Sequence, residues 1–312
     1  MSNGLTPSRL RAPEGGSAPP RELTEAPPPS GLWRVTLGWL LRDRQGRAGL
    51  ILVGLMVLEA IFAPLIAPYP PLELAPREQF QPPSWSRPFG SDEFGRDLLS
   101  RVIYGSRISL IAGGGAVLLG ALIGVSLGMI AGYCRGLTET ILARLFDLIL
   151  AFPAVLLAIA AIAVLGRSTQ SAVIAIGLIN VPAFARMARA SVLTESEKEY
   201  VEAVRSVGAG HWHLLVRTLL PNVLPPVMVL ASVAMAAAIL LEASLSFLGL
   251  GTQPPAPSWG NMVSAGRTYL SNAPWYGVFP GLFIMVLILG LNLLGDGLRD
   301  ALDPRRQRRF KG

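Results

Sequence analysis

The chain alternates between long apolar runs and short polar segments. Six runs are long and apolar enough to form membrane-spanning helices, at residues 48–67, 108–132, 145–165, 171–190, 223–250 and 278–295. A helix needs about 20 predominantly apolar residues to cross the hydrocarbon core of a bilayer. The pattern therefore predicts an all-α polytopic membrane protein with six transmembrane helices.

The composition agrees with a membrane protein and disfavours a soluble or nucleic-acid-binding one. Hydrophobic residues make up 51% of the 312 residues and charged residues 15%, whereas soluble domains carry about 25% charged residues. The net charge is +7, and many basic residues flank apolar runs, as is typical of membrane orientation signals. The single cysteine, Cys134, excludes an intramolecular disulfide.

Basic residues at the two ends predict the orientation. They precede the first span and follow the last one: Arg34, Arg42, Arg44 and Arg47, then Arg305, Arg306, Arg308, Arg309 and Lys311. The positive-inside rule places both termini, and the polar segment at 195–222, in the cytoplasm. The loops at 68–107 and around Trp259 are then expected to face outward.

A glycine repeat marks the second span. Its members are four residues apart: Gly120, Gly124, Gly128 and Gly132. Small residues at this spacing let helix backbones approach closely in lipid. The repeat predicts a packing face, either within the chain or against another subunit.

Few side chains offer chemistry. Ionisable residues in or near the spans are Glu59, Asp147, Arg186 and Glu242. Snorkelling toward the membrane surface explains Asp147 and Arg186, while Glu242 either lines a polar pathway or makes an interhelical hydrogen bond.

Motifs for nucleotide binding, hydrolysis and metal binding are missing from the sequence. It contains no P-loop, no G-x-S-x-G and no H-E-x-x-H. The two histidines, His211 and His213, point to different faces of a helix. We therefore expect no catalytic residue, no cofactor and no metal site in this chain.

The polar segment "EYVEAVRSVGAGHWHLLVRTLLPN" (199–222), here called the elbow, has a helical pattern with one break. Apolar residues recur at helical spacing on both sides: Tyr200, Val204 and Val207, then Trp212, Leu215, Val216 and Leu219. Gly208 and Gly210 permit a sharp turn, and Pro221 is expected to end the second helix and begin the next span. The pattern predicts two short amphipathic helices with Glu202 and Arg205 on the polar side.

The elbow either lies on the membrane surface or binds another protein. A surface helix should have a basic polar face that attracts anionic lipid. Acidic residues outnumber basic ones here: Glu195, Glu197, Glu199 and Glu202 against Lys198, Arg205 and Arg217. This balance favours a protein partner that receives a helix in a groove.

Residues 202–222 resemble the cytoplasmic EAA loop of bacterial ABC importer permeases, with the pattern E-A-A-x3-G-x9-I-x-L-P. The matching positions are Glu202, Ala203, Gly208, Leu220 and Pro221, while Val204 and Thr218 depart from the pattern. Three further stretches, 87–110, 242–262 and 292–305, resemble the dipeptide/oligopeptide/nickel branch of these permeases. The resemblance runs from about residue 42 to the C-terminus.

This resemblance implies a type I ABC importer permease (MetI-like) fold in the bacterial inner membrane. It also implies the partners: a second homologous permease in a heterodimer, two cytoplasmic ABC ATPase subunits, an extracytoplasmic binding protein and the surrounding membrane lipid. The elbow would dock on the ATPase through Glu202, Ala203, Gly208, Trp212, Leu220 and Pro221. Peptides are the expected substrate, and nickel or another small solute is the alternative.

The domain division follows from these expectations. Residues 1–47 form a disordered proline-rich tail with a basic flank, and 48–107 form the first span with an outer loop that docks the binding protein or covers the pore. Residues 108–300 form the permease core, which contains the elbow, and 301–312 form a basic cytoplasmic tail.

Two rival functions remain. One is an ATP-independent channel or secondary transporter, which should show paired intramembrane charges or inverted repeats. The other is an intramembrane enzyme, for which the sequence offers no set of catalytic groups.

Overall fold

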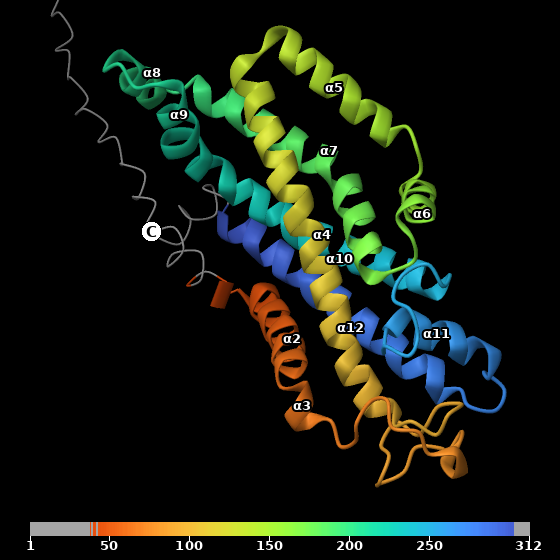
Figure 1. Cartoon of the computed structure of the whole chain (residues 1–312). Helices are drawn as coiled ribbons and strands as arrows, with labels where there is room; N and C mark the ends of the chain where they lie inside the picture. Colours follow the sequence, from red (N-terminus) through yellow and green to blue (C-terminus); the bar gives the residue numbers. More distant parts are fainter. Residues whose placement is uncertain (1–37, 39, 42, 303–312) are drawn as a thin grey trace, which may run out of the picture.

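The computed structural model describes residues 38, 40, 41 and 43–302. Helices make up nearly all of its regular structure (Figure 1): α2 (Arg44–Ile61), α3 (Ala63–Ile66), α4 (Leu98–Cys134), α5 (Gly136–Leu150), α6 (Ala154–Leu165), α7 (Thr169–Ser196), α8 (Glu199–Ser206), α9 (His211–His213), α10 (Leu220–Phe247), α11 (Trp259–Thr268) and α12 (Trp275–Leu302). No β-strand occurs among the described residues, so the all-α prediction is confirmed. Most of the predicted tail and basic flank at 1–47 (residues 1–37, 39 and 42) and the basic cluster at 305–311 lie outside them, whereas Arg44 and Arg47 belong to the first turn of α2.

In the described part of the chain, four helices are long and apolar enough to cross a membrane: α4, α7, the continuous helix His211–Phe247, and α12. The pair α5 and α6 forms a fifth candidate that is bent by 92°. Helix α2 does not qualify by composition, because its 18 residues include Arg44, Arg47 and Glu59. The polytopic architecture is confirmed, with four to five candidate spans among the described residues, and the count of six is not confirmed.

The prediction of one helix at 145–165 is wrong. Helix α5 ends at Leu150, and α6 begins at Ala154 after a sharp bend. Pro153 stands between them, where it lacks an N–H for a helical hydrogen bond and disfavours helical geometry at Phe152. A proline inside an apolar run therefore divides this segment.

Three other predicted boundaries also differ. The first span stops at Ile61, and a separate short helix, α3, follows it. Helix α4 begins ten residues earlier than predicted, at Leu98, because the side chain of Asp97 caps it by accepting from the Ser100 amide (2.8 Å). The outer loop is therefore residues 68–97. Helix α11 lies within the predicted loop around Trp259.

Helices α4 and α7 pack closely through the predicted glycine face. The four glycines of the repeat all lie against α7. A Cβ atom on Gly124 would lie 2.5 Å from the Val181 carbonyl oxygen, and one on Gly128 would overlap the carbonyl of Ala185. Only glycine allows backbones this close, and the repeat is therefore used within the chain.

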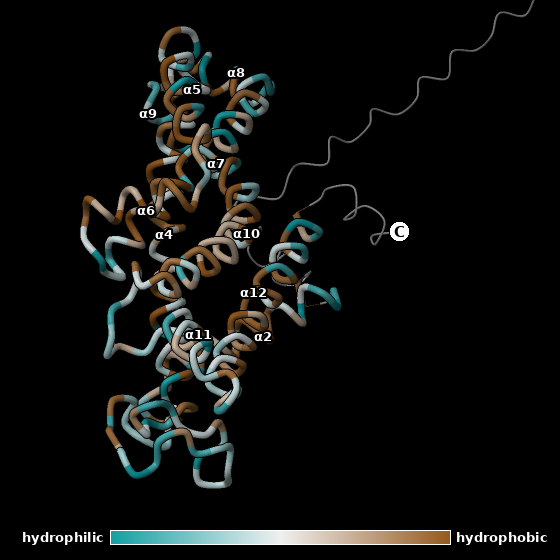
Figure 2. The backbone as a smooth tube through the Cα atoms, turned by 90° about the vertical axis from the view of Figure 1, so that its right-hand side faces the viewer, coloured by the Kyte–Doolittle hydropathy of each residue, from teal (hydrophilic) through white to brown (hydrophobic). Residues whose placement is uncertain are grey.

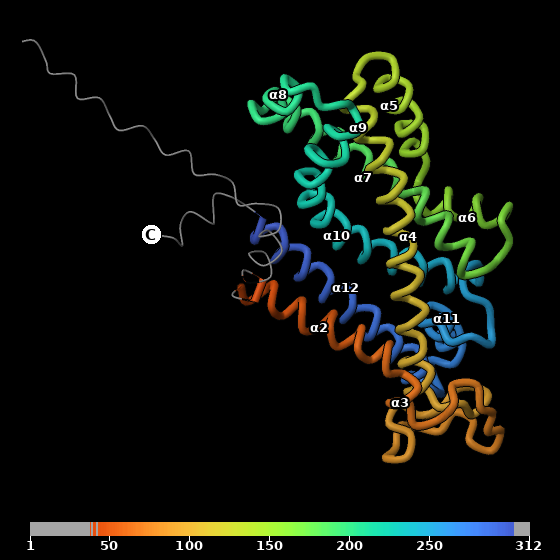
Figure 3. Tube along the Cα trace, turned by 60° about the vertical axis from the view of Figure 1, so that its left-hand side comes forward, coloured from red at the N-terminus to blue at the C-terminus, as the bar shows by residue number. Residues whose placement is uncertain are grey.

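A second close contact joins α2 to α12 and was not predicted. A Cβ atom on Gly46 would lie 3.3 Å from the Cα of Gly297, and one on Gly49 would lie 2.8 Å from the Gly290 carbonyl oxygen. Figure 3 shows the two helices side by side. The glycines at both ends of the described chain therefore fix the position of the N-terminal helix.

The molecule has two polar ends. The elbow, with α8 and α9, lies at one end, and the loop of residues 68–97 lies at the other (Figures 1 and 3). Figure 2 shows that both ends are largely hydrophilic and that the helices between them are hydrophobic. Helix α10 contributes to both main hydrophobic clusters, so it connects the two halves of the core.

Candidate functional site

A glycine sets the turn of the elbow. Helix α8 ends in a Schellman motif, in which the Gly208 amide donates to the Arg205 carbonyl (3.0 Å) and the Ala209 amide donates to the Val204 carbonyl (3.4 Å). This motif needs a left-handed residue, and Gly208 has a φ of +83°. Gly210, two residues on, has an ordinary φ of −69°.

One face of the elbow is buried and the other is exposed. Val201, Leu214 and Leu219 are buried in the hydrophobic cluster shared with α4 and α7. The exposed residues include Glu202, Ala203, Val207, Gly208 and Trp212. Val207 and Trp212, which belong to the predicted apolar faces, are 83% and 77% exposed. A helical pattern identifies an apolar stripe, but it does not say whether the same chain covers it.

The helix after the turn runs without interruption from His211 to Phe247. The prediction that it ends before Pro221 is therefore wrong. The segment Leu214–Leu219, immediately before this proline, is π-helical. Pro221 has no N–H, and its ring would clash with the carbonyl of the preceding α-helical turn. The wider π-helical turn accommodates both features. Leu220 and Pro221 are thus half-buried residues inside one helix that joins the elbow to the membrane core.

A tyrosine joins three parts of the elbow. The Tyr200 hydroxyl donates to the Glu195 carboxylate (2.7 Å) at the end of α7, and the Asn222 amide donates to the Tyr200 oxygen (3.2 Å) from the start of α10. Lys198 Nζ donates to the other Glu195 oxygen (2.6 Å). Burial, followed by the hydrogen bond to Glu195 and its negative charge, raises the pKa of Tyr200 above that of an ordinary phenol.

Another tyrosine joins the elbow to α4. The Tyr133 hydroxyl and His211 Nδ1 are 2.5 Å apart, and the two rings meet edge to face. Among the described residues, no three His, Cys, Asp or Glu side chains are grouped as a metal site.

Ion pairs join α5 to α7. Arg186 donates to Asp147 (2.7 Å), and Arg189 Nε donates to Glu139 (2.8 Å). Asp147 and Arg186 are each about half exposed. Asp147 and Arg186 form an ion pair with each other. The snorkelling interpretation did not include this pair.

Glu242 is fully buried near the far end of α10. Its Oε1 accepts from Ser246 (2.7 Å) and from Thr252 (3.5 Å), and the Thr252 hydroxyl also contacts that of Thr169 on α7 (2.9 Å). The second carboxylate oxygen has no hydrogen-bond partner among the described residues, and the same holds for one oxygen of Glu59. Glu242 therefore joins α10 to the loop that follows it, and Thr252 of that loop joins α7.

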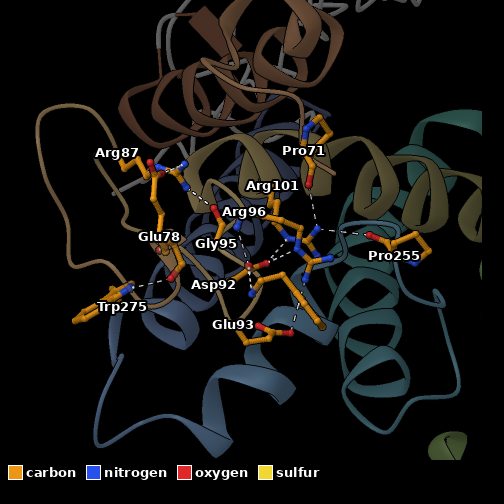
Figure 4. Close-up of polar contacts among 12 residues, drawn as sticks. Pro71, Glu78, Arg87, Asp92, Glu93, Gly95, Arg96, Arg101, Pro255 and Trp275 are labelled. Atoms are coloured by element: carbon orange, nitrogen blue, oxygen red, sulfur yellow. Dashed lines mark hydrogen bonds and ion pairs between the residues drawn. The ribbon is translucent and has the colours of Figure 1, made fainter. Parts of the chain in front are cut away.

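A buried ionic network organises the loop end (Figure 4). Asp92 accepts from Arg96 Nε (2.6 Å) and lies 3.4 Å from Arg101 Nε. Arg101 also donates to the carbonyls of Pro71 (3.1 Å) and Pro255 (3.5 Å). Hydrogen bonds to charged groups are among the strong ones in proteins. The buried charges of "SDEFGRD" (91–97) therefore hold the loop together.

Trp85 is the most exposed aromatic side chain of the loop. Trp85 is fully exposed in a turn closed by a hydrogen bond from the Ser84 amide to the Arg87 carbonyl (2.9 Å). The Tyr69 hydroxyl donates to the Ser86 carbonyl (3.3 Å), and the Arg87 guanidinium lies over the Tyr69 ring. Ser91, by contrast, is completely buried.

Sequence reasoning missed most of these contacts. Tyr200 and Asn222 are 22 residues apart, and Arg101 and Pro255 are 154 apart. Trp259, expected in an outward loop, is buried and donates from Nε1 to the Val102 carbonyl (2.9 Å). A serine N-cap position before "WGNMV" was the available signal for helix α11.

Comparisons with known proteins identify the family. Residues 124–308 match the model for the binding-protein-dependent transport system inner membrane component, and residues 31–83 match the N-terminal transmembrane domain of oligopeptide transport permease C. A dipeptide transport system permease protein DppC from Alkalihalophilus pseudofirmus is 43% identical over 95% of this chain and 96% of its own length.

Other relatives carry related names. A di/tripeptide transport system permease protein DppC from Pseudomonas aeruginosa is 44% identical over 82% of this chain and 87% of its own. A glutathione transport system permease protein GsiD from Pectobacterium atrosepticum is 40% identical, with coverages of 88% and 91%.

A solved structure supports the fold. A chain of the MetNI methionine ABC transporter in an inward-facing conformation superposes with a TM-score of 0.55, over 66% of this chain and 98% of that one, at 19% identity. The predicted MetI-like fold is therefore confirmed. The chain belongs to the family of binding-protein-dependent transport system inner membrane components, the membrane-spanning permease subunits of ABC importers.

Proposed function

We propose that this chain is one of two homologous permease subunits of an importer for short peptides. The two relatives described above as dipeptide and di/tripeptide permeases support this substrate class, since the chain matches them over most of its length. In this proposal a second permease completes the pathway, two ATPase subunits bind at the elbow, and a binding protein delivers the peptide at the loop end.

The elbow is the observation that carries the proposal. Its exposed face contains Trp212 and Glu202, while its buried face is fixed to the membrane helices. A large exposed aromatic beside polar groups is typical of a protein interface. Because the helix from His211 to Phe247 is continuous, a partner that moves the elbow also moves a membrane-spanning segment.

The same proposal sets the orientation. Arg44 and Arg47 begin α2, and the basic cluster at 305–311 follows α12. The positive-inside rule places these residues in the cytoplasm together with the elbow. The loop at 68–97, at the opposite end (Figure 1), then faces the binding protein.

A charge reversal on the exposed face tests the ATPase contact. In the complex purified with its co-expressed subunits, Glu202→Lys should weaken ATPase copurification and lower ATP-driven uptake of a labelled dipeptide. Glu197→Lys, an equal charge change at an exposed residue before α8, is the control and should retain both. Normal ATPase binding and uptake in Glu202→Lys would contradict the proposed contact.

The substrate class has its own test. Vesicles that contain the complete transporter and its binding protein should accumulate a labelled dipeptide in the presence of ATP, and unlabelled dipeptide should compete while Ni²⁺ should not. Competition by Ni²⁺ alone would favour the nickel alternative. Uptake by the purified chain without ATP would contradict the importer assignment.

A further inference from the structure

The elbow is a loop of chain that is closed at its base. It leaves the membrane core after α7, reverses at Gly208, and returns as the helix that becomes α10 (Figure 1). Tyr200 lies at the start of the outgoing arm, and Asn222 lies on the returning arm. Their hydrogen bond (3.2 Å) joins the two arms at the base, far in sequence from the turn at the tip.

The Tyr200 hydroxyl uses both of its hydrogen-bonding roles. It donates its proton to Glu195 (2.7 Å) and accepts a proton from Asn222. Glu195 is also held by Lys198 (2.6 Å), and Asn222 also donates to the Thr218 carbonyl in its own helix (2.9 Å). A phenol can donate one hydrogen bond while accepting another. Phenylalanine has the same ring and can make neither bond.

This bridge limits the ways in which the elbow can deform. The tip contains two glycines, Gly208 and Gly210, and no Cβ contact would restrain either of them. A turn of this kind can act as a hinge, so a force on α8 could open the arms instead of moving α10. The contact at Tyr200 ties α8 directly to the first turn of α10 and to the last turn of α7.

We propose that Tyr200 is a positioning residue for energy coupling, and that its bridge between Glu195 and Asn222 keeps the two arms of the elbow closed while the ATPase moves it. The inference rests on the proposed function, in which the ATPase acts at the elbow. Tyr200 acts through the helices it joins, and the exposed contact face, with Glu202 and Trp212, lies elsewhere on the elbow. Removal of the hydroxyl therefore leaves ATPase binding intact and reduces the movement that reaches α10.

The first experiment measures the bridge itself. Hydrogen exchange is followed in α8 in the complete purified complex for the wild type, Tyr200→Phe and Asn222→Leu. Loss of a hydrogen bond to a charged group should speed exchange of the α8 amides about tenfold in Tyr200→Phe. The matched control is Tyr133→Phe, which removes the α4 phenol that contacts His211 of the elbow while leaving the arms joined. Exchange in α8 should stay at the wild-type rate in this variant.

The second experiment measures coupling. ATP hydrolysed per molecule of dipeptide imported should rise about fivefold in Tyr200→Phe, the lower end of the coupling typical between two sites. ATPase copurification should not change. The double variant Tyr200→Phe/Asn222→Leu should match Tyr200→Phe alone, because both substitutions break the same bridge.

Three results would overturn the inference: wild-type α8 exchange in Tyr200→Phe, a wild-type ratio of ATP to dipeptide, or loss of ATPase binding, which would make Tyr200 a contact residue. Failure of the proposed function looks different, since the wild-type complex itself would then show no ATP-driven dipeptide uptake. The exchange measurement needs no substrate, so it tests closure of the arms in either case.

Discussion

Two glycines two residues apart allow the turn of the elbow to be tested with almost no steric ambiguity. A Cβ atom on Gly208 or on Gly210 would meet no atom within 4 Å. The two positions differ in backbone conformation, with φ of +83° at Gly208 and −69° at Gly210. A comparison of alanine at the two positions therefore measures the cost of the left-handed backbone at Gly208 without a change in packing.

The expected energies follow from this difference. An L-residue in the left-handed region costs about 1–2 kcal/mol, so Gly208→Ala should destabilise the closed turn by about that amount. Gly210→Ala keeps an allowed φ and reduces the freedom of the unfolded chain, which contributes about 0.4–1 kcal/mol of stability. The two variants should differ by about 2 kcal/mol, or roughly thirtyfold in the local equilibrium between closed and open turns.

The assay compares both variants in the purified transporter complex. We expect Gly208→Ala to speed hydrogen exchange at residues 204–209, to weaken ATPase copurification and to lower dipeptide uptake, with Gly208→Val more severe because its side chain is β-branched. Gly208→Asn should lie between wild type and alanine, since asparagine tolerates left-handed geometry. Membrane insertion should be normal in all of them. Equal behaviour of Gly208→Ala and Gly210→Ala would refute the reasoning.

Three further pairs of substitutions test other parts of the structure. In intact cells, a membrane-impermeant thiol reagent should label Ser86→Cys, which is exposed, and should not label Ser91→Cys, which is buried. If Ser86→Cys were labelled only after the membranes are opened, the proposed orientation would be contradicted. Gly128→Ala should lower the thermal stability of the detergent-purified complex by about 1–3 kcal/mol through overpacking against α7. The control, Gly114→Ala, should not, because its Cβ would have one contact at 3.9 Å. Equal melting temperatures of the two variants would refute the packing argument. Glu242→Gln should keep an acceptor for Ser246 and nearly normal uptake. Glu242→Leu should lose about 1–3 kcal/mol of stability in the same assay, because the buried hydroxyls lose their hydrogen-bond partner. Loss of uptake in a stable Glu242→Gln variant would instead place this residue in the substrate pathway.

The sequence predicted those features that depend on local rules. The reversal at Gly208 follows from the conformational freedom of glycine, and the close approach of α4 to α7 follows from a four-residue repeat. Both signals lie within one segment of the chain. Each could therefore be read without knowing how distant segments pack.

The errors came from features in which two local signals compete or in which distant segments meet. Pro153 lies inside a run whose hydropathy suggests one span, and the backbone restriction of proline outweighs the apolar composition. Pro221 shows the reverse, because the preceding π-helical segment lets the helix continue. The contacts of Tyr200 with Asn222 and of Arg101 with Pro255 join segments that no periodicity relates.

The helix from His211 to Phe247 unites these observations. Its 37 residues span about 56 Å at 1.5 Å per residue, well beyond the roughly 30 Å hydrocarbon core of a bilayer. Trp212 lies at one end, and Glu242, with its bonds to Ser246 and Thr252, lies near the other. Packed helices shift as units rather than deforming continuously. A displacement of the elbow should therefore reach the Glu242 cluster, and through Thr252 the start of α7. We therefore predict that Glu242 acts by fastening the far end of this helix, as an anchor of the coupling path and not as a wall of the substrate pathway.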